Sequence, residues 1–435
     1  MFISVALSKI LYTVDVWGIP KPIEGIAMHK RGTSGMVTKL TSTQRAGALA
    51  VTGGLRTTPT DVLDLHAFIM PLHLEIDKAC HRAASRLATL PPSHPLYKPA
   101  RLCVNPRTKR HRSPLHQLMQ MYAVRPHETE TISPAPRNPA LSHKRPFTIS
   151  VSSNKDNSIE EDLRATEAVR IYTDRSAQEG KVGAAALMIR QGEPNRTLHY
   201  HLGPSSKHTV HEVELVGILL GLHLIRTDKK GKTSYAMGID NQAAISTLNS
   251  VKASTSQHIA NVILETAARI KKQRNSTRYS LTFRWTAGHV GIKGNEEVDG
   301  EAKKATEGLT SDKKALPPLL RKALKNNKSA LRQNKKENLK NRLQQEWDAS
   351  IRATKYRSIG FSSPSNKFIK LISDENLSRN DTSRIFQLRT GHVPLNAYLE
   401  HFKRADSAQC PACGHPRENV QCYGTTCECL LYGYD

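Results

Sequence analysis

Four acidic residues stand where a sequence seldom places a solvated carboxylate. Asp174 and Asp240 each end a short apolar run, Glu214 interrupts an apolar helical run, and Asp299 follows the string Gly294-Asn-Glu-Glu-Val. A single Asp at a strand end is most often a turn or a helix cap. Several carboxylates in one pocket, however, repel one another unless cations neutralise them. Because oxygen-only ligation favours Mg²⁺ or Mn²⁺, we expect the four side chains to hold a pair of such ions suited to phosphodiester displacement.

The residues around these carboxylates predict a mixed α/β domain at 166–308, because short β-branched or alternating runs are separated by runs of helical periodicity. The expected strands are 168–173, 182–189, 197–202, 234–239 and 279–285, and the expected helices are 208–226, 241–249, 255–273 and 294–307. Three strands precede the first helix. We therefore expect an antiparallel start followed by alternating strands and helices.

Four strings in this domain resemble the type 1 ribonuclease H family in their order and spacing. They are Tyr172-Thr-Asp-Arg-Ser, Glu212-Val-Glu-Leu, Ile239-Asp-Asn-Gln-Ala-Ala and the highly specific Trp285-Thr-Ala-Gly-His-Val-Gly-Ile-Lys-Gly-Asn-Glu-Glu-Val-Asp-Gly-Glu-Ala-Lys. The resemblance implies a five-stranded mixed sheet flanked by helices, and hydrolysis of the RNA strand of RNA/DNA hybrids. It also implies two Mg²⁺ ions, with Mn²⁺ as the alternative, and a set of catalytic residues: Asp174, Glu214, Asp240 and Asp299 as metal ligands, and His289 in acid/base chemistry or product release.

The same resemblance implies that Ser176, Asn241 and Gln242 contact the substrate, where ribose 2′-hydroxyl groups would distinguish RNA from DNA. Asn241 and Gln242 are equally suited to cap the helix that follows them. Glu212 competes with Glu214 for the second ligand position. The Glu-Leu pair and the apolar helical residues after it favour Glu214.

One residue departs from the family pattern, because Arg175 follows the first Asp where the family usually has Gly. If glycine is needed there for a positive φ or for close approach of the hybrid backbone, arginine would hamper substrate binding. Otherwise it adds a cation near phosphate. The complete carboxylate set favours an active enzyme, and the alternative is a catalytically silent nucleic-acid-binding remnant. A third hypothesis, DNA integration or resolution by a relative of the same fold, is disfavoured by the Gly288-His and Asn295-Glu context.

The chain is strongly basic, with 64 Lys and Arg against 38 Asp and Glu in 435 residues and a formal net charge of +26. Such an excess predicts a polyanionic partner, most commonly nucleic acid. Residues 311–345 carry 11 Lys and Arg against two acidic residues. This stretch suits either a solvated charged helix or a helix that follows phosphates. The sequence indicates no particular protein partner.

Four further regions are expected outside the α/β domain. Residues 1–100 have helical periodicity, and residues 101–165 are expected to be a Pro-rich basic linker, because 91–150 contain 11 of the 23 prolines. Residues 309–405 are expected to be a basic helical region. Residues 406–435 form a cysteine-rich tail.

The N-terminal region resembles the segment after the reverse transcriptase palm in non-LTR (LINE-like) retrotransposon polyproteins. The strings that carry the resemblance are Val14-Asp-Val-Trp-Gly, Leu40-Thr-Ser-Thr-Gln-Arg and Thr52-Gly-Gly-Leu-Arg-Thr-Thr-Pro-Thr-Asp-Val-Leu. Near the other end, Leu388-Arg-Thr-Gly-His-Val-Pro-Leu-Asn resembles the segment before the terminal knuckle of those polyproteins, and we assign His392 no role. The chain contains no Tyr-x-Asp-Asp motif, so polymerase activity is not expected. An unrelated helical bundle is the alternative for residues 1–100.

Four cysteines of the tail have a spacing that could surround a tetrahedral zinc ion, Cys410-x₂-Cys413-x₈-Cys422-x₄-Cys427. Polyproteins of this type often end in a Cys-Cys-His-Cys knuckle, and here Cys422 stands in place of the histidine. A working knuckle and a decayed one both remain open. His415 and Cys429 are alternative ligands.

No apolar run reaches the roughly 18 residues that a membrane-spanning helix needs, so we expect no membrane association. The first residues lack the basic leader and the cleavage site of a secretion signal. Clustered cysteines suit a metal site in a reducing compartment better than a disulfide framework. We therefore expect an intracellular protein, either nuclear or cytoplasmic.

Overall fold

The computed structural model describes residues 2–18, 34–104, 113–134, 145–230, 233–249, 253–288, 290–353, 356 and 366–423. The chain divides into two compact units. The larger is His81–Lys335, and the smaller combines Met1–Cys80 with Lys336–Asp435. Among the residues just given, no helix is long and apolar enough to cross a membrane.

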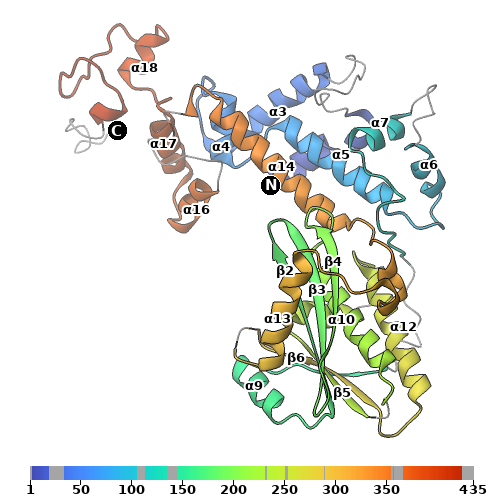
Figure 1. The fold of residues 1–435 in the computed structure, drawn as a ribbon. Coiled ribbons are helices and arrows are strands. Elements are labelled where there is room, and N and C mark those ends of the chain that lie inside the picture. The colour runs from blue at the N-terminus through green and yellow to red at the C-terminus, as the bar shows by residue number, and fades with distance from the viewer. Residues whose placement is uncertain are drawn as a thin grey trace. The chain divides into compact units, whose positions relative to one another are not determined.

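The elements are labelled in Figure 1 and have the following bounds. The strands are β1 (Thr148–Ser150), β2 (Val169–Gln178), β3 (Lys181–Arg190), β4 (Arg196–Pro204), β5 (Ser234–Ile239) and β6 (Ser280–Trp285). The helices are α1 (Leu7–Ile10), α2 (Val14–Trp17), α3 (Ser34–Thr52), α4 (Thr60–Ala67), α5 (Leu72–Ala88), α6 (Tyr97–Leu102), α7 (Pro114–Met121), α9 (Lys155–Leu163), α10 (Val210–Thr227), α11 (Gln242–Asn249), α12 (Gln257–Arg274), α13 (Lys293–Thr306), α14 (Lys328–Asp348), α16 (Lys367–Asp374), α17 (Arg379–Thr390) and α18 (Asn396–His401). Three short helical segments of π or 3₁₀ type are η1 (Phe2–Ala6), η2 (Lys313–Ala315) and η3 (Pro318–Arg321).

The larger unit is built on one mixed sheet with the strand order β1-β6-β5-β2-β3-β4. β2, β3 and β4 are antiparallel neighbours, whereas β5 runs parallel to β2, and β6 and β1 continue in parallel. The antiparallel start and the later alternation with helices confirm the mixed α/β fold predicted from the sequence. The sheet has six strands where five were expected.

Helices cover both faces of this sheet (Figure 1). α10 and α12 contribute to the large core on one face, which contains Ile171 of β2 and Phe283 of β6. α13 covers the other face, where Tyr172 of β2 packs with Val298 and Ala302 of the helix. The alternation of Ile171 and Tyr172 between the two faces follows from the two-residue period of a strand.

The additional strand β1 comes from the stretch that was expected to be a linker. Ile149 pairs with Phe283 of β6, and the ring of Phe147 stacks on Phe283 with centroids 4.2 Å apart. Helices α7 and α9 lie in the same stretch. A strand of three residues is too short to show an alternating pattern. The proline-rich composition around it therefore led to the prediction of a linker.

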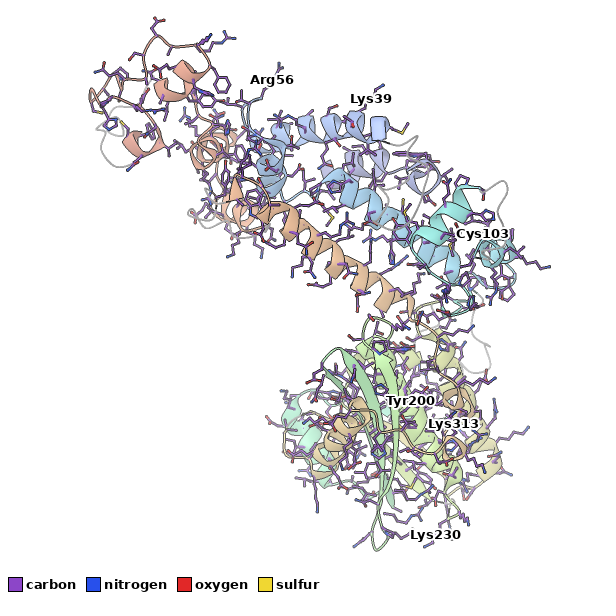
Figure 2. All side chains as sticks on the ribbon, turned by 45° about the horizontal axis from the view of Figure 1, so that its top comes forward. Lys39, Arg56, Cys103, Tyr200, Lys230 and Lys313 are labelled. Atoms are coloured by element: carbon purple, nitrogen blue, oxygen red, sulfur yellow. The ribbon has the colours of Figure 1, made fainter. Side chains whose placement is uncertain are left out.

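The region after α13 was expected to be basic and helical, but its first part, 309–327, packs against the sheet domain. Leu316 and Leu320 are buried in the same core as α10, and the hydroxyl of Tyr200 on β4 donates to the carbonyl of Lys322. Figure 2 labels Tyr200 and Lys313 in this part of the unit. Pro317 lacks the N–H that a continuous helix needs. The long basic helix α14 begins at Lys328.

The smaller unit joins helices from both ends of the sequence in one core. His66 of α4 contacts the rings of Tyr356, Phe368 and Phe386 edge-on, at centroid distances of 5.8, 5.4 and 5.0 Å. The core also includes Trp347 at the end of α14. The N-terminal helical region and the later part of the basic helical region are thus one structural unit, although their sequences gave no sign of belonging together.

Candidate active site

Asp174 lies on the central strand β2, one residue beyond the point where β2 pairs with Ile239 of β5. It pairs with Ala185 of β3 and is 6% exposed. The backbone N–H of Arg175 donates to its Oδ1 at 2.7 Å. The sheet therefore holds this carboxylate in a fixed position, with neighbouring strands on both sides.

Glu214 comes from the second turn of α10 and is almost fully buried at 2% exposure. The helix begins after Thr209, whose hydroxyl accepts the N–H of Glu212 at 3.2 Å. Gly217 and Gly221 let the helix approach the sheet closely. A Cβ at Gly217 would lie 3.4 Å from Cβ of Thr173, and one at Gly221 would lie 2.8 Å from Cε of Met237. This close approach places Glu214 beside Arg175 of β2.

Asp240 follows the last residue of β5, and Trp285 fixes its backbone by donating its indole N–H to the Asp240 carbonyl at 2.9 Å. Gly288 lies against the side chain, because a Cβ there would be 3.7 Å from Oδ2 of Asp240. The amide of the next residue, Asn241, donates to Oε1 of Glu214 at 3.4 Å. Asp240 therefore lies close to Glu214 at one end of the parallel strands.

Asp299 is carried by α13 on the opposite face of the sheet. Gly294 in the first turn allows this helix to pack on Tyr172 of β2, since a Cβ at that position would lie 2.2 Å from the ring. One helical turn further along, Nζ of Lys303 lies 2.7 Å from Oδ2 of Asp299. The negative charge of Asp299 is thus partly neutralised by Lys303 of the same helix.

The electrostatics connect these four side chains. Burial is the main cause that raises the pKa of Asp174 to about 7, and the charges of Asp240 and Asp299 raise it further. Burial also raises the pKa of Glu214 to about 8, reinforced by Asp240 and Asp174 and opposed by Arg175. Each carboxylate therefore lies near at least one other, and Asp174 lies near the other three.

The carboxylates do not form a closed coordination shell. Within the described ranges, one group of three or more potential ligands has atoms that all lie within 4.8 Å of one another, and that group consists of cysteines. The acidic side chains lie further apart than this and influence one another electrostatically. Their oxygen-only chemistry fits hard divalent cations, and two of the four, Asp174 and Glu214, are buried.

Glu212 and Glu214 have different surroundings in the structure. Oε2 of Glu212 lies 3.1 Å from Nδ1 of His208, and both side chains are buried. Burial raises the pKa of Glu212, with the charge of Glu130 as a further contribution. Glu212 thus belongs to a separate buried pair, and Glu214 is the residue that lies among the other carboxylates.

The predicted substrate residues lie close to this group with different degrees of exposure. Ser176 is two residues beyond Asp174 on the same face of β2 and is 6% exposed. Asn241 caps α11, because its Oδ1 accepts the N–H of Ala243 at 2.9 Å. Gln242 is exposed at the start of α11. The capping interpretation of Asn241 is therefore correct, whereas His289 lies outside the described residues.

Two neighbours of the carboxylates were not identified from the sequence as parts of the site. Trp285 and Gly288 hold the backbone and border the side chain of Asp240, and both fall inside the highly specific string. The string was informative as a whole, but it could not show which of its members touch Asp240.

A scan against known families identifies this part of the chain. Residues 166–307 match the family model described as RNase H. We refer to them below as the RNase H-like domain. The match covers about a third of the 435 residues. No curated protein matches the chain.

The solved structures that match part of this chain include the N-terminal RNase H domain of Rv2228c from Mycobacterium tuberculosis. It has 18% identity over 32% of this chain and 93% of that one, with a TM-score of 0.25. RNase H1 from the archaeon Halobacterium salinarum has 14% identity over 32% of this chain and 98% of that one, with a TM-score of 0.24. LC9-RNase H1, a type 1 RNase H with the type 2 active-site motif, has 18% identity over 34% of this chain and 75% of that one, with a TM-score of 0.26.

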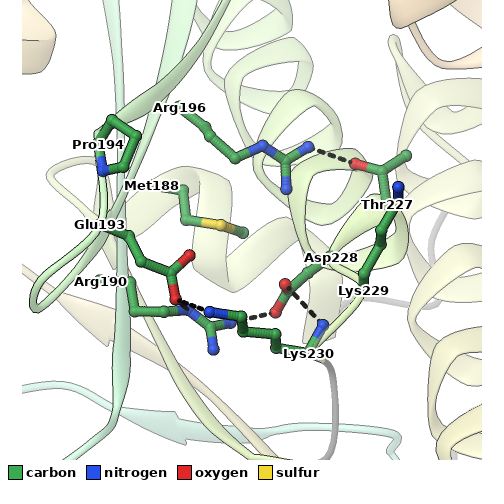
Figure 3. Close-up of a pocket in the computed structure, with 9 residues that line it drawn as sticks. All are labelled: Met188, Arg190, Glu193, Pro194, Arg196, Thr227, Asp228, Lys229 and Lys230. Atoms are coloured by element: carbon green, nitrogen blue, oxygen red, sulfur yellow. Dashed lines mark hydrogen bonds and ion pairs between the residues drawn. The ribbon is translucent and has the colours of Figure 1, made fainter.

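A cavity of about 350 Å³ lies at the other end of the RNase H-like sheet (Figure 3). Its wall includes Arg190, which pairs with Val169 at the start of β2, whereas Asp174 lies five residues further along that strand. Arg190 forms an ion pair with Asp228, and Lys230 forms one with Glu193 at 2.8 Å. These side chains largely neutralise one another, so the cavity does not extend the acidic site.

The cysteine tail contains the close ligand group. The sulfur atoms of Cys410, Cys413 and Cys422 all lie within 4.8 Å of one another, with 3.7 Å between Cys413 and Cys422. His415 is outside this group, and its Nδ1 lies 3.2 Å from the backbone nitrogen of Arg417. Cys427 and Cys429 lie outside the described residues. Three of the four sequence-predicted zinc ligands are therefore brought together.

Proposed function

We propose that the RNase H-like domain hydrolyses the RNA strand of RNA/DNA hybrids with the help of divalent metal ions. The proposal is carried by one observation: four carboxylates from β2, α10, β5 and α13 lie in one electrostatic environment inside a domain that matches the RNase H family model. Burial and the neighbouring negative charges raise the pKa values of Asp174 and Glu214, so these two groups are costly to ionise without nearby positive charge.

Asp174, Glu214, Asp240 and Asp299 are the residues that would hold the ions. Bound Mg²⁺ would lower the pKa of a water and stabilise the departing 3′ oxygen of the cleaved strand. The chain itself supplies the rigid supports for these ligands. The ladder of β2 fixes Asp174, and Trp285 fixes the backbone of Asp240.

The test is cleavage of an RNA/DNA hybrid by the full chain, with the RNA strand labelled and Mg²⁺ present. We expect Asp174→Asn to slow cleavage by more than about a hundredfold, because it removes the central ligand charge. Binding of the hybrid, measured by fluorescence anisotropy, should persist. Asp156→Asn on the exposed surface of α9 makes the same chemical change away from the site and should cleave like the wild type.

An intact hybrid after several hours with the wild-type chain would contradict this proposal. If that chain still bound the hybrid, and the affinity fell steeply between about 50 and 200 mM salt, the silent nucleic-acid-binding alternative would replace it.

We also propose that the tail binds one zinc ion through Cys410, Cys413, Cys422 and Cys427. Three neighbouring thiols support this, because thiolates are preferred zinc ligands. The full chain purified with zinc should contain one ion per chain by atomic absorption. Cys413→Ser should lose it, whereas Cys103→Ser, which changes a cysteine outside the tail, should keep it. Equal zinc in the wild type and Cys413→Ser would contradict the assignment.

We further infer that the chain derives from the C-terminal part of a non-LTR retrotransposon polyprotein. The N-terminal strings and the cysteine tail support this. The DNA that precedes its coding sequence should then encode a Tyr-x-Asp-Asp polymerase motif, and flanking DNA without any trace of one would contradict the inference.

A further inference from the structure

Arg175 occupies a regular position in the sheet. It pairs with Ala184 of β3, and it is not among the described non-glycine residues with positive φ. The backbone therefore does not require glycine at this position. The consequences of having arginine here come from its side chain.

The side chain of Arg175 lies on the face of the sheet that α10 covers. Successive residues of β2 alternate between faces, since Thr173 lies near Gly217 of α10 whereas Tyr172 lies near Gly294 of α13. Any side chain at position 175 consequently points towards the start of α10. Of the two acidic residues in the first turns of α10, Glu212 pairs with His208, and Glu214 faces Arg175.

The two side chains form an ion pair. Nε of Arg175 donates to Oε1 of Glu214 at 3.1 Å. The glutamate side chain is 2% exposed, and that of the arginine is 38% exposed. The partly exposed guanidinium group thus contacts Oε1 of Glu214, a side chain that the proposed function assigns to a metal ion. The guanidinium group brings a positive charge to this oxygen.

Burial and the neighbouring charges of Asp240 and Asp174 oppose ionisation of Glu214, and the charge of Arg175 favours it. A divalent ion at this position would provide the same compensation. It would also have to share Oε1 with the guanidinium or displace it, and two cations a few ångströms apart repel each other.

We propose that Arg175 takes the place of one of the two metal ions, so that the chain binds a single divalent ion tightly. This inference rests on the proposed function, because it assumes that the carboxylates form a metal site. Asp174, Asp240 and Asp299 would hold the tight ion, and Glu214 would be engaged by Arg175. Removing the charge at position 175 should open the second position.

The experiment counts Mn²⁺ ions bound to the full chain, by electron paramagnetic resonance of free Mn²⁺ during titration, so it needs no catalysis. Binding to Asp174→Asn is subtracted as the background of other sites. We expect one Mn²⁺ for the wild type and for Arg175→Lys. We expect two for Arg175→Gln, with the affinity at the second position increased by at least about tenfold.

A matched control is Arg196→Gln, which removes an exposed arginine near the cavity at the other end of the sheet and should still bind one ion. Two ions in the wild type, or one ion in Arg175→Gln, would overturn the inference about Arg175 and leave the metal site intact. No binding above the Asp174→Asn background in any variant would instead overturn the proposed function.

Discussion

Asp174 shows how a single buried carboxyl links stability to pH. Burial raises its pKa to about 7 in the folded chain, whereas the ordinary value is 3.8. Below about pH 4 the group is protonated in both the folded and the unfolded chain, so it makes no difference to stability. As the pH rises from 4 to 7, the unfolded chain gives up the proton first, which favours unfolding. The loss of stability is complete above about pH 7.

We therefore expect Asp174→Asn to stabilise the metal-free chain at pH 8 by ~1–4 kcal/mol, since the amide carries no charge to bury. The gain should disappear near pH 4. The measurement is urea unfolding in the presence of a chelator, followed by tryptophan fluorescence, to which Trp285 of the RNase H-like domain contributes with Trp17 and Trp347. Asp156→Asn serves as the control, because Asp156 is exposed. A variant less stable than the wild type at pH 8 would contradict this account.

At the scale of elements, α13 illustrates how small residues position a charged one. The helix carries Asp299, and its first turn packs on the buried ring of Tyr172 through Gly294. The ring has little freedom to move, because its hydroxyl donates to Oδ1 of Asp162 at 2.9 Å. The position of the carboxylate thus depends on a glycine five residues earlier in the chain.

Gly294→Ala should destabilise the RNase H-like domain by ~1–3 kcal/mol, because the new Cβ would overlap the Tyr172 ring. Gly300→Ala in the same helix is the matched control. Nothing lies within 4 Å of a Cβ at Gly300, so alanine there should stabilise the helix by up to about 1 kcal/mol. Thermal unfolding of both variants tests this. Equal melting temperatures of the two variants would contradict this prediction, because α13 would then move away from Tyr172 without loss of stability.

At the scale of the whole molecule, the order of regions along the chain is not the order of structural units. His66 near one end shares a core with Phe368 and Phe386 near the other, and residues 81–335 lie between them in the sequence. The sequence suggested separate flanking regions, because hydrophobic periodicity identifies a buried helix face without identifying its partner. The sheet domain likewise extends beyond the family match, to β1 on one side and to Leu320 on the other.

The residue types and spacing alone predicted the mixed α/β elements of the central domain and singled out the acidic residues that we propose for its site. The strand at 234–239 was predicted with the bounds that the structure has, and Glu214 was chosen over Glu212. Strands and helices can be predicted from local patterns, because strand alternation and helical periodicity depend on residues that are close together in the sequence.

Only the tertiary structure decided the contacts between residues far apart in the chain. Arg175 forms an ion pair with Glu214, and Glu212 pairs with His208. The strand β1 pairs with β6 at the edge of the sheet. The physical reason is common to all three. A charge or a short strand acquires its partner through the close packing of elements, and the distances across that packing depend on the whole fold and not on any local pattern.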